Sequence, residues 1–538
     1  LEINFFQIYY TIFWGCIFLF LFYNYQKKKD KIRNYPPSPL SLPIVGHLYL
    51  LARYATEPWI GFNEIKKKYG DIVKLQLGEY NFVLLSSIKS IKEVLLIKSQ
   101  QFMDRPHFER YEYVFGGDRD NALALCDWSK LQKLRRSMAK SSVIPKYGSK
   151  LFNELDDCIA KELGLFTDWI EKNNFKKITK LDTLVSVNNI FFDYLCSLRF
   201  DYEDKENREI MNKYDIIFWD INKCYAYDFI PWLTKFGIIK RKLIDIKAVC
   251  DSVRDYIEKV ILPRHEKLKN DEEKLKLEPL ENCQDFLEFT LRTHYSDPIN
   301  FNWMTTLYLL GDLLGGNSAV ANLLYRVLGY LALNPDCQQR IYEEAKAVLK
   351  EFPNEDNIIK LNLKSKMVYT ESCVLETLRL ISSPLVPHVA TQDTTIGDYF
   401  VKKNTCIMFN CYNFNCSEEY HLEPNTYEPT RFLIPKDKPE DFDLTEKKFY
   451  VRSNQQIEYN SYQVFRPNYF FPFSWGKRAC LGFKMAQTIS FCTIANLVLN
   501  YSIEPDDDYE KMKKQVTLKG CLALEVENIY DLKITKRE

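Results

Sequence analysis

The 538-residue chain lacks an excess of charge of either sign, and it lacks the cysteine spacing of small metal-binding modules. It has 73 Lys and Arg residues against 72 Asp and Glu, so its net charge is +1, which argues against a nucleic-acid-binding protein that relies on bulk positive charge. The 15 cysteines are an odd number, they are scattered, and none forms a C-x-x-C pair. We therefore expect neither a zinc module nor a disulfide scaffold, and reduced thiols facing the cytosol fit better.

Internal repeats and low-complexity linkers are also absent from about residue 50 onward. A chain of this length has room for two or three domains, but the uninterrupted mixture of patterns is consistent with one. Two apolar runs, 72–77 and 81–86, flank a Gly-Glu-Tyr turn as in a β-hairpin, and helical patterns dominate afterwards. The longest predicted helix covers about 303–333, ends before an Asn-Pro pair and would measure roughly 45 Å.

The amino terminus is apolar over a length that suits one membrane-spanning helix, with no charged residue between Ile3 and Gln26. A basic cluster and closely spaced prolines follow, so we assign 1–26 to a membrane anchor and 27–49 to a basic and proline-rich linker. A cleaved secretory signal is the alternative, but the basic cluster follows the apolar run and no small-residue cleavage site is evident. By the positive-inside rule, the rest of the chain stays in the cytosol.

The most informative motif is F-S-W-G-K-R-A-C-L-G, which begins at Phe473 and contains Cys480. Most cysteines are small buried hydrophobes, but here each neighbour suits a thiolate that ligates haem iron. Gly476 and Gly482 allow a tight turn that brings backbone N–H groups near the sulfur, Arg478 supplies a charge for a propionate, and Phe473 can shield the sulfur from water. The spacing fixes five positions at once, so chance is a poor explanation.

This motif resembles the haem-binding signature of cytochromes P450. The resemblance implies a mainly α fold with small β-sheets, the cytochrome P450 fold, as a single catalytic domain over 50–538 behind an amino-terminal transmembrane helix. It also implies haem b as cofactor, with Cys480 as the thiolate ligand of its iron.

Three further residues match the network that locks the haem-binding core in this family. Glu376 and Arg379 lie three residues apart on one predicted helix face, and Arg431 belongs to a later P-T-R-F segment. By themselves such pairs are common on protein surfaces and nearly neutral in energy. The resemblance implies that they are buried together, and a buried network is costly to break.

Haem brings two carboxylates, and four residues are candidate partners. Arg478 is the first, because its guanidinium can hold a carboxylate at two points. The resemblance adds Trp128, expected on a helix, and His388, although a lone His is more often a satisfied polar residue. The arginine that usually follows the tryptophan by four residues is here Gln132, and Arg135, two helical turns after Trp128, could substitute.

The central helix departs from the family pattern of a small residue, Gly, any residue, an acid and Thr, in which the acid and alcohol relay protons. The matching positions include Gly315 and Gly316, but Ser318 replaces the acid and Ala319 the threonine. Two adjacent glycines in a helix imply a close neighbour, either a packed helix or a groove for O2 and substrate. Proton delivery then falls to Ser318, Asn317, ordered water or a substrate hydroxyl, or else the oxygen chemistry differs from simple hydroxylation.

Together, G-G-N-S-A-V on the central helix, W-S-K-L-Q-K-L-R-R at 128–136 and P-H-V-A-T-Q-D-T-T at 387–395 resemble the Spook and Spookier group of insect cytochromes P450. The resemblance implies a haem-thiolate monooxygenase acting on a sterol, at an early oxidation from 7-dehydrocholesterol in ecdysteroid biosynthesis. Two alternatives stay open. One is a broad-specificity xenobiotic-metabolising microsomal P450, which should retain the acid-threonine pair, and the other is a P450 that rearranges an oxygenated sterol, or only binds haem or sterol, without activating O2.

The resemblance also implies NADPH-cytochrome P450 reductase as electron donor, with cytochrome b5 as a second candidate, at the endoplasmic reticulum membrane. A basic face formed by the cysteine loop and the 128–140 helix would attract an acidic flavoprotein, although a solvated helix face explains each single lysine as well. Aromatic segments at 105–115 and 224–232 are expected to line an apolar sterol cavity or to dip into the bilayer.

Overall fold

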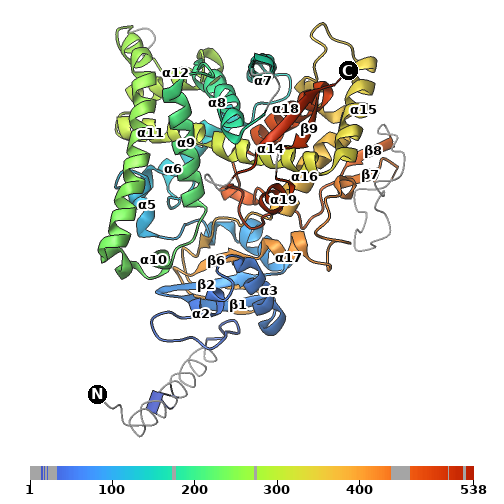
Figure 1. Cartoon of the computed structure of the whole chain (residues 1–538). Helices are drawn as coiled ribbons and strands as arrows, with labels where there is room; N and C mark the ends of the chain where they lie inside the picture. The colour runs from blue at the N-terminus through green and yellow to red at the C-terminus, as the bar shows by residue number, and fades with distance from the viewer. Residues whose placement is uncertain are drawn as a thin grey trace, which may run out of the picture.

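The computed structural model describes residues 14, 15, 17, 21, 33–172, 177–271, 276–437, 461–506, 508–524 and 529–537. Within them the predicted class is confirmed, because long helices dominate and the sheets are small (Figure 1). The anchor predicted for 1–26 lies outside the described residues except at four positions. No helix among the described residues combines the length and apolarity needed to cross a bilayer.

A four-stranded sheet with strand order β1-β2-β6-β3 lies at the lower end of Figure 1. Its strands are β1 (Ile72–Leu77), β2 (Tyr80–Leu85), β6 (Cys406–Phe409) and β3 (His388–Val389), and nearby helices are α2 (Leu48–Ala52), α3 (Pro58–Tyr69), α4 (Ile88–Lys92) and α17 (Cys411–Cys416). β1 and β2 form the predicted antiparallel hairpin, in which Ile72 pairs with Leu85. The end of the predicted proline-rich linker joins this sheet, because His47 N–H donates to the Gln76 carbonyl at 2.6 Å.

The larger part of the molecule is helical. Its helices are α5 (Glu109–Val114), α6 (Lys130–Val143), α7 (Lys150–Lys172), α8 (Lys180–Cys196), α9 (Lys205–Ile221), α10 (Ala226–Phe229), α11 (Gly237–Lys269), α12 (Phe286–Ser296), α13 (Trp303–Leu314), α14 (Gly316–Leu333), α15 (Pro335–Glu351), α16 (Val368–Ile381), α18 (Phe483–Asn500) and α19 (Tyr509–Val516). Three two-stranded sheets complete it, formed by β4 (Thr394–Ile396) with β5 (Tyr399–Val401), β7 (Leu433–Pro435) with β8 (Tyr462–Val464), and β9 (Tyr501–Pro505) with β10 (Leu532–Lys536).

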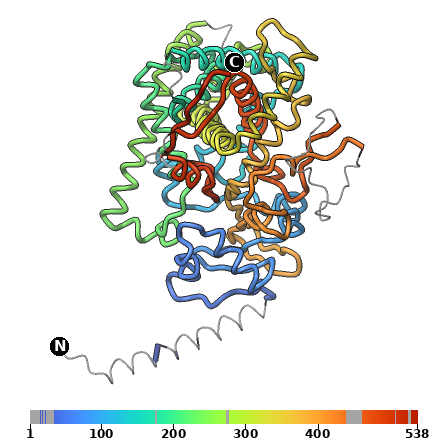
Figure 2. The backbone as a smooth tube through the Cα atoms, turned by 45° about the vertical axis from the view of Figure 1, so that its right-hand side comes forward, coloured from blue at the N-terminus to red at the C-terminus, as the bar shows by residue number. Residues whose placement is uncertain are grey.

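The predicted central helix is present as α13 and α14, which together cover the expected range. They are separated only at Gly315, whose φ of −60° and ψ of −16° remain right-handed helical. The Asn302 side chain caps the start by accepting from Thr305 N–H, and the helix stops before Pro335, which opens the first turn of α15. Figure 2 shows this helix, in yellow, at the centre of the molecule with other helices around it.

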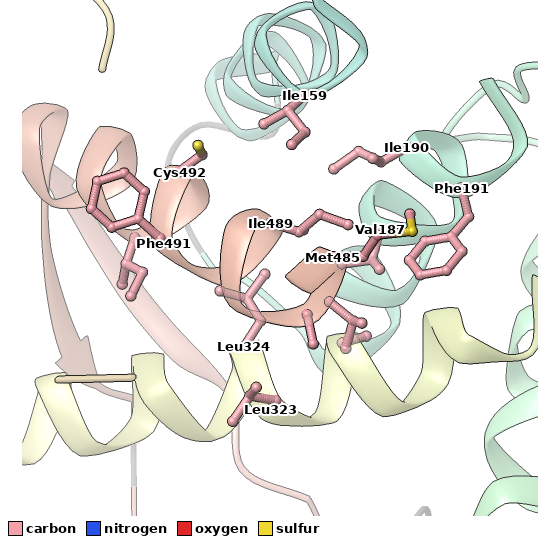
Figure 3. Packing of buried hydrophobic residues seen from close by; sticks show 14 of the residues in the cluster. Ile159, Val187, Ile190, Phe191, Leu323, Leu324, Met485, Ile489, Phe491 and Cys492 are labelled. Atoms are coloured by element: carbon pink, nitrogen blue, oxygen red, sulfur yellow. The ribbon is translucent and has the colours of Figure 1, made fainter. Parts of the chain in front are cut away.

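The main core surrounds α14. Figure 3 shows apolar side chains that converge from four helices: Ile159 of α7, Val187 and Ile190 of α8, Leu323 and Leu324 of α14, and Met485 and Ile489 of α18. All of these side chains are buried. Because Leu323 and Met485 also line the cavity of the candidate site, this core directly supports one of its walls.

Candidate active site

A cavity of about 550 Å³ lies between the central helix and the Cys480 loop. Volumes of this order are typical of small-molecule sites. Most of its wall is apolar and comes from α8, α9, α11, α13 and α14, with members that include Phe191, Ile217, Val253, Ile257, Leu307, Val320 and Leu323. Of the two expected aromatic segments, 105–115 contributes Arg105, Val114 and Phe115, whereas no residue of 224–232 lines the wall. Phe218 and Ile221 of α9, outside both segments, line it instead.

Cys480 faces this cavity from a tight loop between the short 3₁₀ turn Gly476–Arg478 and helix α18. Its N–H donates to the Phe473 carbonyl at 2.9 Å, which closes the loop. Gly476 has φ +78°, and a Cβ there would lie 2.2 Å from the Leu95 carbonyl oxygen, so only glycine fits. Phe473 and Gly482 also line the cavity.

Cys480 is exposed and lines the cavity. Burial raises the pKa of this thiol, while the Gly482 N–H and the charge of Arg136 oppose the rise. The start of α18, two residues further on, adds the positive end of a helix dipole. The loop therefore supplies groups that stabilise a thiolate once a cation such as a metal is bound.

Three arginines, of which Arg105 and Arg478 are buried and Arg136 is half-buried, gather near Cys480 without any ion pair among the described residues. All three line the cavity. Arg478 Nη2 donates to the carbonyls of Ala124 and Cys126 at 2.8 and 2.9 Å, but its Nε and Nη1 atoms are buried with no partner in the described structure. Burial lowers the pKa of each guanidinium, to about 10 for Arg136, and their mutual repulsion adds to the effect on Arg105 and Arg136.

Arg136 rather than Arg135 is the arginine that the structure places at the cavity. Arg136 Nη2 donates to the Ala479 carbonyl at 2.6 Å, whereas Arg135 donates to the Asp120 carbonyl and to Thr305 Oγ1 and does not line the cavity. The periodicity argument fails because Ser129 is the N-cap of α6, so Trp128 lies outside the helix. The Trp128 ring instead lies 5.8 Å from the Arg478 guanidinium carbon and does not belong to the cavity wall.

His388 lines the cavity from β3, and its Nδ1 lies 2.6 Å from the Phe102 carbonyl oxygen. Burial and the charge of Arg105 hold the pKa of this imidazole well below its usual value, so the ring is neutral. With Nδ1–H donating to Phe102, Nε2 is left as an acceptor. Arg105, which the sequence reasoning missed in this role, is the permanent cation beside it and donates to the carbonyls of Val386 and Pro387 at 3.2 and 3.1 Å.

On the central helix, the structure separates the four predicted positions. Gly315, Gly316 and Ala319 line the cavity, but Ser318 does not, and its buried hydroxyl has no partner among the described residues. A Cβ on Gly316 would lie 3.3 Å from the Phe191 ring, so the glycine pair both packs against a helix and faces the cavity.

Asn317 is also turned away from the cavity, because its Nδ2 donates to Asn188 Oδ1 at 2.8 Å. Neither Ser318 nor Asn317 therefore reaches the cavity to deliver a proton. The remaining options from the sequence are ordered water and a hydroxyl of the substrate.

Asp312 is a cavity residue that the sequence reasoning missed. It lies on α13, and one carboxyl oxygen accepts from the Leu123 N–H. Burial raises the pKa of this carboxyl to about 6. Its place two turns before Ala319, on the same helix face, was the one sequence signal that could have identified it.

Glu376, Arg379 and Arg431 meet in a fully buried network. The Glu376 carboxylate accepts from Arg379 Nη2 and Nε, both at 2.7 Å, and from Arg431 Nε at 3.3 Å. Arg379 also donates to the Pro424 carbonyl at 2.8 Å, and Arg431 to the Glu423 carbonyl at 2.8 Å. The network thus fastens the 422–426 loop to α16.

Comparison with known proteins identifies the class. The family model described as "Cytochrome P450" matches residues 36–529, so the chain belongs to the cytochrome P450 family of haem-thiolate oxidoreductases. Its similarity to an insect enzyme is confirmed by "Cytochrome P450 307a1" of Drosophila melanogaster, 35% identical over 87% of this chain and 83% of that protein. "Steroid 17-alpha-hydroxylase/17,20 lyase" of Homo sapiens is 24% identical over 90% of this chain and 89% of that protein. "Cytochrome P450 2J1" of Oryctolagus cuniculus is 25% identical over 93% and 91%.

The residues present fit the haem that this family uses. Haem offers an iron for a thiolate and two carboxylates for cations. Of the described cysteines that line the cavity, Cys250 and Cys411 are buried and Cys480 is exposed, and Cys480 lies beside three arginines that lack counter-ions among the described residues. The unpartnered Nε and Nη1 atoms of Arg478 are donors that a carboxylate would satisfy.

Proposed function

We propose that this P450 is a sterol-oxidising monooxygenase that acts at an early step from 7-dehydrocholesterol in ecdysteroid biosynthesis. The observation that carries the proposal is the cavity, which joins a long apolar wall to a cysteine and an arginine cluster at one side. An apolar polycyclic substrate buries its surface against such a wall. The resemblance to the Spook and Spookier group, and the similarity to an insect P450, supply the particular substrate class.

Each residue near Cys480 has a proposed role in holding the cofactor. Cys480 ligates the iron, and Arg478, Arg136 and Arg105 pair with the carboxylates, with Trp128 supporting Arg478 by ring contact. When bound, haem b supplies the activation of O2 for insertion of oxygen into the substrate. Glu376, Arg379 and Arg431 keep their proposed structural role, and the neutral His388 ties β3 to the Phe102 carbonyl.

The central helix positions the substrate rather than supplying an acid–alcohol pair. Gly315, Gly316 and Ala319 let a flat apolar molecule approach the helix backbone closely, because none of them has a side chain longer than a methyl group. Since Ser318 does not reach the cavity, we assign proton delivery to ordered water or to a hydroxyl of the substrate.

Electron supply by NADPH-cytochrome P450 reductase, with cytochrome b5 as a second donor, is proposed at the face that carries the Cys480 loop. Its lysines Lys130, Lys133, Lys140, Lys477 and Lys484 are exposed, so an acidic partner can reach them. Arg135 and Arg478, which were expected on the same face, are buried and do not contribute.

We also propose attachment to the endoplasmic reticulum membrane, with the catalytic domain on the cytosolic side. The segment after α10 exposes Trp232, Phe236 and Ile238, the last at 89% of its surface. It lies beside the β1–β2 turn, where Glu79 N–H donates to the Phe229 carbonyl at 2.9 Å. Exposed aromatic and aliphatic side chains of this kind insert at the lipid interface.

Reconstitution of the full chain with reductase, NADPH and 7-dehydrocholesterol tests the proposal. We expect sterol-dependent consumption of NADPH and O2 and an oxidised sterol by mass analysis, with the Cys480→Ser variant as the inactive control. Turnover of unrelated drugs at comparable rates would favour the broad-specificity alternative. Conversion of an oxygenated sterol without O2 uptake would favour the rearrangement alternative. The observation that supports this alternative is that Ser318 replaces the acid and Ala319 the threonine of the family pattern.

A further inference from the structure

We propose that Asp312 is the recognition residue for a hydroxyl group at one end of an otherwise apolar polycyclic alcohol. The inference rests on the proposed function and deepens it, because it names the part of the substrate that the protein recognises by a polar contact. Asp312 would act as a positioning residue that fixes the orientation of the substrate in the cavity.

The first argument is the distribution of charge around the cavity. Among the described residues that line it, Asp312 is the single carboxylic acid. Of the arginines that line it, Arg105, Arg136 and Arg478 belong to the Cys480 side, where the cofactor carboxylates are proposed to bind. The fourth, Arg254 on α11, already pairs with Asp251 and Asp255. Asp312 instead lies among Leu307, Leu313 and other apolar residues of the substrate wall.

The second argument is the state of the Asp312 carboxyl itself. One oxygen accepts from the Leu123 N–H, and the other has no hydrogen-bond partner among the described residues. The side chain is only partly exposed, so water cannot solvate it as in bulk. A carboxyl in this position loses hydration on burial and gains from any donor that a ligand brings. Its pKa of about 6 keeps most of it ionised at neutral pH, as an acceptor.

The third argument concerns geometry along the helix. Asp312 precedes Ala319 by seven residues, so the two lie on the same helix face about 10 Å apart. A hydroxyl held at Asp312 therefore leaves a different part of a polycyclic molecule beside Ala319 and the small-residue segment. This arrangement sets which region of the substrate is presented for oxidation, and it protects the hydroxyl end from it.

Binding measurements with matched ligands test the inference. The ligands are 7-dehydrocholesterol, its 3-deoxy analogue and its 3-methyl ether, and the readout is the dissociation constant for haem-loaded full-length protein. Because a hydrogen bond to a charged group is involved, we expect the alcohol to bind roughly 10- to 100-fold more tightly than the 3-deoxy analogue. The methyl ether, which cannot donate, should bind as weakly as the 3-deoxy analogue.

Two variants separate recognition from a structural role. Asp312→Asn keeps an oxygen for the Leu123 N–H but presents an amide donor to the ligand, so the preference for alcohol over methyl ether should fall to about 5-fold or less. Asp312→Leu should abolish the preference. Leu307→Val, which trims the same apolar wall, is the matched control and should weaken both ligands equally. Each comparison is a ratio within one protein, so partial loss of folded material cancels.

Equal alcohol-to-deoxy ratios in the wild type, Asp312→Asn and Asp312→Leu would overturn the inference and leave Asp312 as a support for Leu123. A 3-amino analogue that binds ten times better than the alcohol would overturn the choice of a neutral alcohol. A tricyclic diterpene alcohol and its parent hydrocarbon serve as a second pair. If the Asp312 variants lose the preference for the diterpene alcohol over its hydrocarbon while no sterol binds, hydroxyl recognition by Asp312 is supported and the proposed sterol function fails.

Discussion

Two groups of buried or half-buried arginines in this protein have opposite surroundings. Arg379 and Arg431 share the Glu376 carboxylate, and the remaining guanidinium nitrogens donate to backbone carbonyls of α17 and of the 422–426 loop. Arg105, Arg136 and Arg478 donate to carbonyls only, without a carboxylate partner in the described structure. The first group finds its counter-ion within the chain, whereas the second leaves Arg478 Nε and Nη1 without a partner among the described residues, as donors for the haem carboxylates that we propose to bind there.

The comparison shows that the presence or absence of a carboxylate partner within the chain distinguishes a structural arginine from one available to a ligand. Removing one partner from a complete network strands the others, which costs stability. Removing a cation that lacks a counter-ion relieves repulsion between like charges in the ligand-free protein, and what is lost is affinity for the ligand. Substitution of an arginine should therefore lower the stability of the protein in the first group and the affinity for the ligand in the second.

The largest effect is expected from breaking the complete network. Glu376→Ala or Arg379→Ala leaves an uncompensated buried charge and should lower the free energy of unfolding by about 3–5 kcal/mol, with loss of haem. Thermal unfolding and haem content of the purified protein measure this. Lys67→Ala is the control, because its pair with Glu64 is exposed and worth less than about 1 kcal/mol. Normal haem content in either network variant would refute the assignment.

In the incomplete cluster, the expected effect is on the ligand. Arg478→Met should change the unfolding free energy of the haem-free protein by no more than about 1 kcal/mol, since lost carbonyl contacts and relieved repulsion offset each other. Haem affinity should fall roughly 10- to 100-fold, measured by absorbance titration, and Arg478→Lys should recover part of it. Unchanged haem affinity, or destabilisation as severe as in Arg379→Ala, would remove the distinction between the clusters.

Protonation of two histidines extends the comparison to pH. Burial and arginine charges lower the pKa of His421, beside the complete network, to about 2, and that of His388, beside the incomplete cluster, well below 6.5. A lowered folded-state pKa gives stability that is present above the unfolded value of about 6.5 and is lost as the pH falls below it, at up to about 1.4 kcal/mol per pH unit for each group.

Urea denaturation between pH 7 and pH 5 measures these contributions. In the haem-free protein, His388→Gln and His421→Gln should each flatten the loss of stability. In the haem-loaded protein, the haem carboxylates near His388 should raise the pKa of this histidine. Only His421→Gln should then still differ from the wild type in how its unfolding free energy falls between pH 7 and pH 5. An identical response of His388→Gln in both forms would contradict the proposed position of the carboxylates.

The smallest effect is expected at Ser318. Its hydroxyl is buried without a partner among the described residues and does not reach the cavity, so Ser318→Ala should keep NADPH and O2 consumption within about twofold. Loss of an unsatisfied hydroxyl should leave the stability unchanged or raise it by about 1 kcal/mol. Ala319→Thr, which adds a hydroxyl to the cavity wall, is the matched variant and should alter the ratio of sterol oxidised to O2 consumed. A tenfold loss of turnover in Ser318→Ala would return Ser318 to the proton route.

Sequence reasoning succeeded for features that depend on neighbours in the chain. The hairpin at 72–85 and the helix at 303–333 follow from local apolar periodicity and from an Asn-Pro stop, and both are present. The same reasoning assigned Arg135 by counting two turns from Trp128, and it failed because the N-cap at Ser129 leaves Trp128 outside the helix. An error of one residue at a helix start is enough to choose the wrong arginine.

By itself, the sequence determined the family, the cysteine with its surrounding glycines and Arg478, and the presence of Ser318 and Ala319 where the family pattern has an acid and a threonine, because these are fixed by identity and spacing along the chain. Only the tertiary structure decided that Arg105 and Arg136 join Arg478, that Ser318 turns away from the cavity, and that Asp312 is the one carboxylic acid among the described residues of a mostly apolar wall. These features bring together residues from distant segments, and whether a charge meets a counter-ion or faces a cavity depends on that packing.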